Sequence, residues 1–143
     1  MRFAKSVIDR TASFVVGTLL LSPLSSYAAG DPAAGQHVFA RCAGCHSTSP
    51  GVNKIGPSLA AVVGRKSGAV AGYNYSPAMK SAGVTWDDAA LDKFLASPAG
   101  FLHGTKMFIA VPNSADRQNV IAYLGTLKQD ARQHADSPRQ QQP

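Results

Sequence analysis

The feature that most constrains this chain is the run CAGCH at residues 42–46. Two thiols three positions apart, followed directly by an imidazole, form the attachment signature of a c-type haem. Each sulfur adds across a vinyl group of the porphyrin, and the histidine ligates the iron. Residues three apart on a helical turn share one face, so Cys42 and Cys45 reach the same planar group. The motif therefore predicts a domain built around one covalently bound haem, with His46 as a ligand.

Other chemistries use parts of this motif. A zinc site needs two further ligands at matching spacing, and no second CxxC and no HxxxH motif follows. A redox-active dithiol is expected after a strand, whereas the residues before Cys42 have the apolar spacing of a helix. A structural disulfide leaves His46 unexplained. Haem attachment is the interpretation that gives all three residues a role.

Residues 1–28 have the pattern of a secretory signal peptide. Three basic residues precede an apolar run at residues 14–21, and small residues, Ser26 and Ala28, occupy the −3 and −1 positions of a cleavage site. The apolar run is too short to span a bilayer, so a retained membrane anchor is the less favoured alternative. Because c-type haem is attached outside the cytoplasmic membrane, we expect a periplasmic protein with no stable membrane span.

The charge of the chain argues against a nucleic-acid partner. The formal net charge is +6, and cleavage after Ala28 would lower it to +4. Two ionised haem propionates would lower it further, and the sequence has no Arg/Lys run of the kind that binds DNA or RNA. A modest positive field is still able to steer an acidic protein partner.

Helical patterns account for most of the remaining sequence. Asp31 as N-cap and Pro32 at the first helical position predict a helix over residues 32–41. Gly35 weakens this helix unless another helix packs closely against it. The apolar spacing after Ser114 predicts a last helix, ending near Lys128, as that partner.

Between these two helices we expect loops and two shorter helices, over about 76–83 and 85–97, with residues 99–112 as an irregular loop. No alternating pattern is long enough to build a sheet. Residues 129–143 lack apolar spacing, which predicts a disordered tail after a single domain of residues 29–128.

The residues alone leave the second iron ligand open. Met79 lies in a short predicted helix and Met107 in a loop long enough to cover the opposite face of the haem. His103 is a competitor, and two histidines would give a lower reduction potential than histidine with methionine. In a small domain a methionine is more often core filler than a ligand.

Residues 31 to about 128 resemble the class I cytochromes c, which include mitochondrial cytochrome c and its short-loop bacterial relatives. The resemblance extends well beyond the haem attachment motif and keeps one collinear order. The matching positions are Gly35 and Phe39 and residues 42–46, 56–59, 64–68, 72–75, 83–86, 104–107 and 121–124.

The resemblance implies an all-α class I cytochrome c fold whose N- and C-terminal helices cross. It also implies Met107 as the second ligand and the carbonyl of Pro57 as the group that orients His46. The same likeness places Arg65, Tyr75 and Trp86 around the inner haem propionate, where each is able to donate a hydrogen bond.

Three positions depart from the family pattern. His103 stands where the family usually has proline, so a histidine lies close to the ligand loop. Met79 replaces a residue that is often polar, and Phe94 replaces a tyrosine that usually contacts the methionine ligand. These changes bear on the tuning of the potential rather than on ligation.

The expected function is that of a monomeric single-haem electron carrier without enzymatic activity, serving membrane respiratory or photosynthetic complexes and periplasmic oxidoreductases. Electrons would leave at a haem edge whose rim includes Arg41, Lys54, Lys106 and Ala110. Three alternatives stay open: a dedicated electron-accepting subunit of a periplasmic dehydrogenase, a peroxidase or gas sensor whose methionine ligand detaches, and a redox dithiol without haem.

Overall fold

The structure, a computed structural model, describes residues 30–136 of the chain and the side chains of residues 30–127. The helices are α1 Pro32–Phe39, α2 Pro77–Ser81, α3 Asp88–Ala96, α4 Pro98–Phe101 and α5 Ser114–Asp136. Over this part of the chain there is no sheet, and one isolated bridge joins Lys66 to Thr85. The expectation of an all-α fold is therefore confirmed. The predicted signal peptide lies outside the described residues.

Short polar side chains fix the starts of the first three helices. Asp31 caps α1 by accepting a hydrogen bond from the backbone N–H of Ala33 at 2.9 Å. Ser76 caps α2 through the N–H of Met79, and Asp87 caps α3 through the N–H of Ala90. Each cap satisfies one of the N–H groups that a helix leaves without an internal partner.

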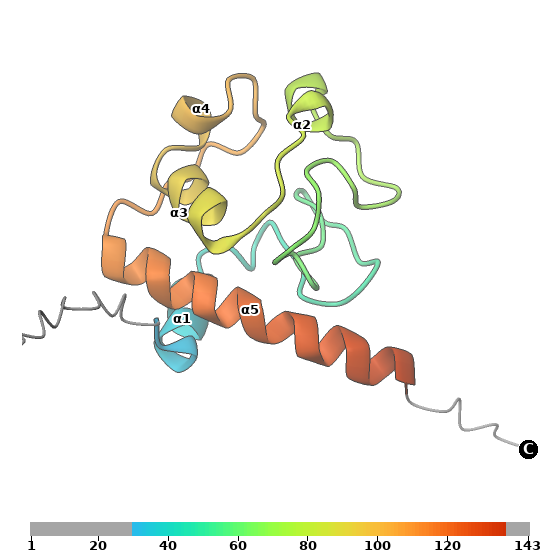
Figure 1. Ribbon diagram of the computed structural model, residues 1–143, viewed down its shortest axis with the longest axis vertical. Helices are drawn as coiled ribbons and strands as arrows, with labels where there is room; N and C mark the ends of the chain where they lie inside the picture. The colour runs from blue at the N-terminus through green and yellow to red at the C-terminus, as the bar shows by residue number, and fades with distance from the viewer. Residues whose placement is uncertain (1–29, 137–143) are drawn as a thin grey trace, which may run out of the picture.

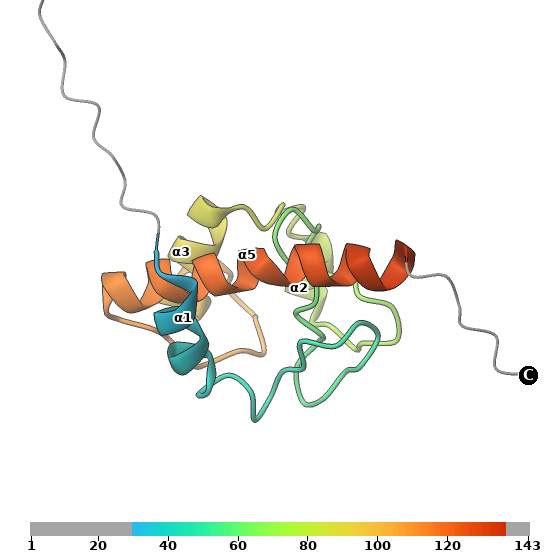
Figure 2. The same cartoon turned by 90° about the horizontal axis from the view of Figure 1, so that it is seen from below.

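The two terminal helices cross, as predicted, with Gly35 at the contact. Figures 1 and 2 show α1 lying against the first half of the much longer α5. A Cβ atom on Gly35 would collide with the backbone carbonyl of Asn119 and would lie 2.9 Å from the Cβ of Tyr123. Only glycine lets the two helices approach this closely. The crossing therefore explains why α1 contains a residue that by itself weakens a helix.

The helix ends differ from the sequence-based prediction. Helix α1 stops at Phe39, and residues 40–45 continue as turns in which the N–H of His46 donates to the carbonyl of Cys42 at 2.9 Å. A short helix, α4, occupies the start of the predicted loop of residues 99–112. Within the described residues, no helix combines the length and apolar character needed to cross a membrane.

Helix α5 extends into the segment for which the sequence predicted a disordered tail. It continues beyond Lys128 to Asp136, so residues 129–136 are helical. These residues include alanine, arginine and glutamine, which favour a helix even without an apolar face, and Pro138 follows two residues after the helix ends. The tail prediction rested on a composition rich in Gln, Arg, Asp and Pro and on the lack of apolar spacing. Residues 137–143 lie outside the described range.

A hydrophobic core lies along one side of α5. Val120, Leu124 and Leu127 of α5 are buried against Leu91 and Leu95 of α3. Figure 1 shows α2, α3, α4 and the long connecting loops gathered on this side, opposite α1. The loops therefore close over the core on the side of α5 away from α1.

Candidate haem site

A cavity of about 500 Å³ opens between α3, α5 and the loops that face them. Its walls are mostly hydrocarbon and aromatic, with few polar groups. All eight residues that the sequence and the resemblance assigned to the site line this one cavity: Cys42, Cys45, His46, Pro57, Arg65, Tyr75, Trp86 and Met107. These residues come from four separate segments of the chain, so the fold brings together what the sequence keeps apart.

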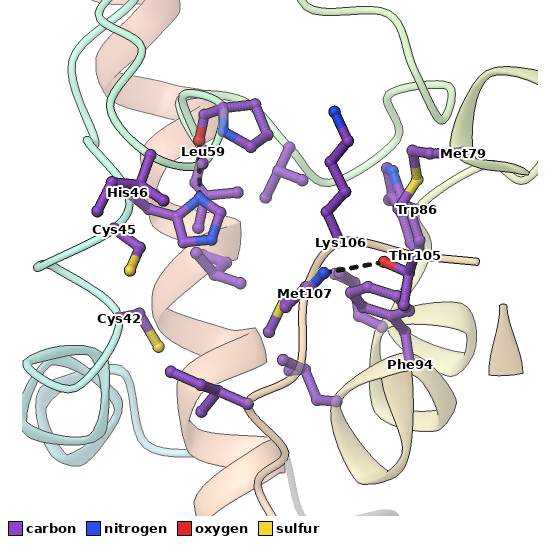
Figure 3. A pocket seen from close by; sticks show the side chains of 18 of the residues that line it. Cys42, Cys45, His46, Leu59, Met79, Trp86, Phe94, Thr105, Lys106 and Met107 are labelled. Carbon is purple, nitrogen blue, oxygen red and sulfur yellow. Dashed lines mark hydrogen bonds between the residues drawn. The ribbon is translucent and has the colours of Figure 1, made fainter. Parts of the chain in front are cut away.

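The two cysteines lie on one side of the cavity as free, half-buried thiols (Figure 3). Burial raises the pKa of the Cys42 thiol, and the nearby Arg41 only partly opposes this effect. A reactive redox dithiol needs a thiol with a lowered pKa. The raised pKa of Cys42, together with the lack of a preceding strand, therefore speaks against the dithiol interpretation.

The ring of His46 is held by its surroundings with one nitrogen directed into the cavity. Its Nδ1 lies 2.8 Å from the carbonyl oxygen of Pro57. Because a carbonyl only accepts hydrogen bonds, Nδ1 carries the proton and Nε2 keeps its lone pair for a metal. Gly56 packs so closely on the ring that a Cβ atom there would collide with it. The Gly56 N–H donates to the carbonyl of Cys45 at 2.8 Å, which ties this loop to the motif.

Met107 approaches the cavity from the loop between α4 and α5. Its N–H donates to the hydroxyl oxygen of Thr105 at 3.3 Å, and Gly104 takes a φ of +85° that favours glycine. Lys106 anchors the loop by donating from Nζ to the carbonyl of Asn74 at 2.8 Å. Figure 3 shows the Met107 thioether reaching towards the side of the cavity that carries the cysteines and His46.

The second candidate methionine, Met79, also lines the cavity, but from α2. Figure 3 shows it on the side where Trp86 lies. His103, the competing histidine, is exposed and is not among the lining residues. Both methionines therefore lie on the cavity wall, and His103 lies outside it.

The three residues expected around a haem propionate all line the cavity. Arg65 donates from its guanidinium to the carbonyls of Ala60 and Ser58 at 2.8 and 2.9 Å. Burial lowers the pKa of Arg65, opposed by Tyr75, and burial raises the pKa of Tyr75. Arg65 thus donates two hydrogen bonds to backbone carbonyls. The resemblance did not imply these bonds.

Trp86 belongs to an aromatic cluster as well as to the cavity wall. It is 7% exposed, and its ring centroid lies 5.0 Å from that of Phe94 and 6.4 Å from that of Phe101. Trp86 is thus part of the aromatic core and of the cavity wall at the same time.

Several lining residues were not predicted. Phe108 and Ile109 line the cavity and are also 84% and 55% exposed, which is unusual for large apolar side chains. The sequence did indicate exposure for both residues, because they follow Met107 in a predicted loop that has no helical face to bury them. Thr105 is buried beside Met107 and gave no such signal. Of the expected rim residues, Arg41 and Lys106 line the cavity, whereas Lys54 and Ala110 do not.

The residues present fit a covalently attached haem. The apolar walls suit the porphyrin, the two thiols suit its vinyl groups, and His46 offers an unprotonated nitrogen. Elsewhere in the wall, Arg65 and Tyr75 offer a positive charge and a phenol to carboxylates. An apolar cavity of this size in a small domain would otherwise be a large unfilled defect.

Comparison with known proteins agrees with this chemistry. Residues 32–128 match the protein family described as Cytochrome c. The chain belongs to the cytochrome c family. It is 47% identical over 114 residues to cytochrome c2 of Rhodomicrobium vannielii, a match that covers 78% of this chain and 91% of the relative. With cytochrome c2 of Rhodoblastus acidophilus it shares 49% identity over 104 residues, covering 71% of this chain and 97% of the relative.

Solved structures of the family share the fold. Cytochrome cH from Methylobacterium extorquens superposes with a TM-score of 0.65 and 43% identity, covering 68% of this chain and 99% of that one. The class I cytochrome c fold implied by the resemblance is thereby confirmed. Family membership together with the two thiols gives this cytochrome one haem c, bound covalently through Cys42 and Cys45.

Proposed function

We propose that this cytochrome is a periplasmic carrier of single electrons between redox proteins, in which His46 and Met107 would ligate the haem iron. The observation that carries the proposal is the convergence of both thiols, the free Nε2 of His46 and the Met107 thioether on one apolar cavity. The haem supplies one-electron exchange between Fe(II) and Fe(III) when it is bound.

Two contacts hold the ring of His46 in place. The Pro57 carbonyl fixes the tautomer of the imidazole, and Gly56 packs against its ring. A histidine whose second nitrogen is hydrogen bonded is oriented for ligation and is a better donor. Little reorganisation is then needed when the charge at the site changes by one unit.

The opposite side of the cavity supplies a thioether and excludes water. Met79, Trp86 and Phe94 give this side hydrocarbon, sulfur and aromatic surfaces. A methionine ligand stabilises the reduced state and raises the reduction potential, and a filled sixth position excludes exogenous ligands. These features favour an electron carrier over a peroxidase or gas sensor.

Partners would dock at the rim where the cavity meets solvent. Phe108 and Ile109 are exposed there and share the cavity wall with Lys106 and with Arg41, whose guanidinium lies 3.5 Å from the Asp116 carboxylate. A small apolar patch bordered by positive groups suits brief contacts with acidic redox partners. Membrane respiratory or photosynthetic complexes and periplasmic oxidoreductases are the partner classes we propose, with the cytochrome acting as a monomer.

A reduced-minus-oxidised visible spectrum with a potentiometric titration tests the proposal. We expect one low-spin c-type haem that titrates as a single one-electron centre at a positive potential. The reduced protein should also resist carbon monoxide at neutral pH, because Met107 fills the sixth position. Rapid carbon monoxide binding would instead favour the peroxidase or sensor alternative.

A further inference from the structure

The guanidinium of Arg117 joins three segments of the chain near the site. Arg117 lies in the first turns of α5, and its Nε donates to Oδ1 of Asp92 on α3 at 2.7 Å. One terminal nitrogen donates to the carbonyls of Val111 and Pro112, at 3.0 and 2.7 Å. The Arg117 side chain is only 12% exposed, whereas that of Asp92 is 40% exposed.

The two carbonyls that Arg117 holds belong to the end of the Met107 loop. Val111 is 3% exposed, and its N–H donates to the carbonyl of Leu95 on α3 at 2.8 Å. With Arg117 on its carbonyl, both polar backbone groups of this buried residue are satisfied. Loss of the guanidinium would leave the carbonyl of the buried Val111 without this partner, which is costly, and would remove the ion pair with the partly exposed Asp92 carboxylate.

The loop has no comparable support in its middle. Among the described residues, no backbone hydrogen bond engages Phe108, Ile109 or Ala110. The start of the loop is held by the Lys106 bond to Asn74. The segment that carries Met107 is thus suspended between two anchors, and Arg117 forms the second.

We infer that Arg117 is a positioning residue that keeps Met107 in the site by anchoring the end of its loop to α3 and α5. The inference rests on the proposed ligation by Met107, and it adds a determinant of how readily that ligand detaches. A fork of donors is needed, because the acceptors lie on two different segments. Lysine, a point charge, is not able to reach all of them in the same way.

The test compares Arg117→Gln, Arg117→Lys and Asp92→Asn in the haem-loaded protein at neutral pH. Imidazole binding to the oxidised protein measures how readily Met107 is displaced, and amide hydrogen exchange at Val111 measures the anchor itself. Lys93→Gln is the charge-matched control, because Lys93 is exposed and adjacent to Asp92. Thermal unfolding of each variant shows how much of any change is global.

We expect Arg117→Gln to tighten apparent imidazole binding about tenfold and to accelerate Val111 exchange by a similar factor, as loss of charge-assisted hydrogen bonds implies. Arg117→Lys should restore little of the parent behaviour, and Lys93→Gln should match the parent. If the Arg117→Gln variant does not bind haem, Asp92→Asn is measured in its place. We then expect a smaller change in imidazole binding and Val111 exchange, in the same direction.

Unchanged imidazole binding and unchanged Val111 exchange in the Arg117 and Asp92 variants would overturn the inference. Equal shifts in Lys93→Gln would overturn it too, since net charge would then be the cause. Tight imidazole binding by the parent protein would instead refute ligation by Met107 and, with it, the role of Arg117 towards the iron. Parent resistance to imidazole thus separates failure of this inference from failure of the proposed function.

Discussion

The proton on His46 is placed by a backbone carbonyl. Nδ1 donates to Pro57 at 2.8 Å, and this bond leaves Nε2 as the nitrogen that points a lone pair into the cavity. A proline at this position has no N–H of its own to compete for the interaction. The tautomer needed for ligation is therefore set by the fold.

The choice between the two methionines is a prediction at the scale of single residues. Met107→Ala should open the sixth position, allow rapid carbon monoxide binding and lower the potential by roughly 0.1–0.3 V, a fraction of the range that axial ligands span. Met79→Leu preserves size and apolar character, so ligation should persist. Potentiometry and carbon monoxide mixing of both variants provide the measurement, and the reverse pattern would make Met79 the ligand.

Some site residues could be predicted from the sequence and others could not. Cys42, Cys45 and His46 were evident because covalent attachment demands a fixed local spacing. Met107 needed the family resemblance, since residue type alone left three candidates. The backbone partners of Arg65 at Ala60 and Ser58 were not predictable, because they depend on how a distant loop folds back.

At the scale of elements, the crossing of α1 and α5 positions the attachment motif. The motif begins three residues after the end of α1, so the angle at which α1 crosses α5 sets where the thiols lie. Phe39 at the end of α1 and Tyr123 of α5 pack with ring centroids 5.3 Å apart. This packing requires the close approach of α1 and α5 at Gly35.

Alanine substitutions at two glycines should therefore have opposite effects. Gly35→Ala places a methyl group against the Asn119 carbonyl and should lower the free energy of unfolding by about 1–3 kcal/mol. Gly125→Ala, within α5, meets nothing within 4 Å and should raise it by about 0.5–1 kcal/mol. Denaturant unfolding monitored by circular dichroism measures both. A neutral Gly35→Ala would contradict the tight crossing.

Helix starts were easier to predict than helix ends. Asp31 and Ser76 mark the starts of α1 and α2 with local hydrogen bonds that the sequence displays. No such signal marks the end of α1 at Phe39, where the chain turns to present the motif. The length of α5 was underestimated because apolar spacing reports burial, whereas the last turns of a helix need only adequate propensity.

At the scale of the whole molecule, the haem cavity replaces much of a conventional core. The wall of this cavity of about 500 Å³ is mostly apolar, so without the haem a large apolar surface would face water. Typical domains are stable by only about 5–15 kcal/mol, so the loss of this burial matters. Folding and haem binding should therefore be coupled.

A variant with both Cys42→Ala and Cys45→Ala tests this coupling. Without thioether bonds, any haem is held only by coordination and packing and is removable by extraction. The extracted chain should lose most of its helical circular dichroism at 25 °C, because the cavity is then unsupported. Retention of the full helical signal and a cooperative thermal transition would show that the polypeptide folds without the group.

The charge around the cavity rim predicts the salt dependence of electron transfer. Oxidation by the anion ferricyanide should slow severalfold between about 0.01 M and 1 M salt, as screening lengths fall from about 30 Å to 3 Å. Lys106→Glu should reduce both the rate at low salt and this dependence. Lys80→Glu, an exposed lysine on α2 outside the cavity lining, is the control. Stopped-flow mixing measures the rates, and equal effects of both variants would refute docking at the rim.

The most direct test of the site is proton NMR of the reduced protein. A methionine bound to low-spin Fe(II) lies over the porphyrin, so the ring current moves its methyl signal far upfield of all other methyl groups. We predict one such signal, which is lost in Met107→Ala and kept in Met79→Leu. A spectrum without an upfield methyl signal, or one whose signal survives Met107→Ala, would contradict ligation by His46 and Met107.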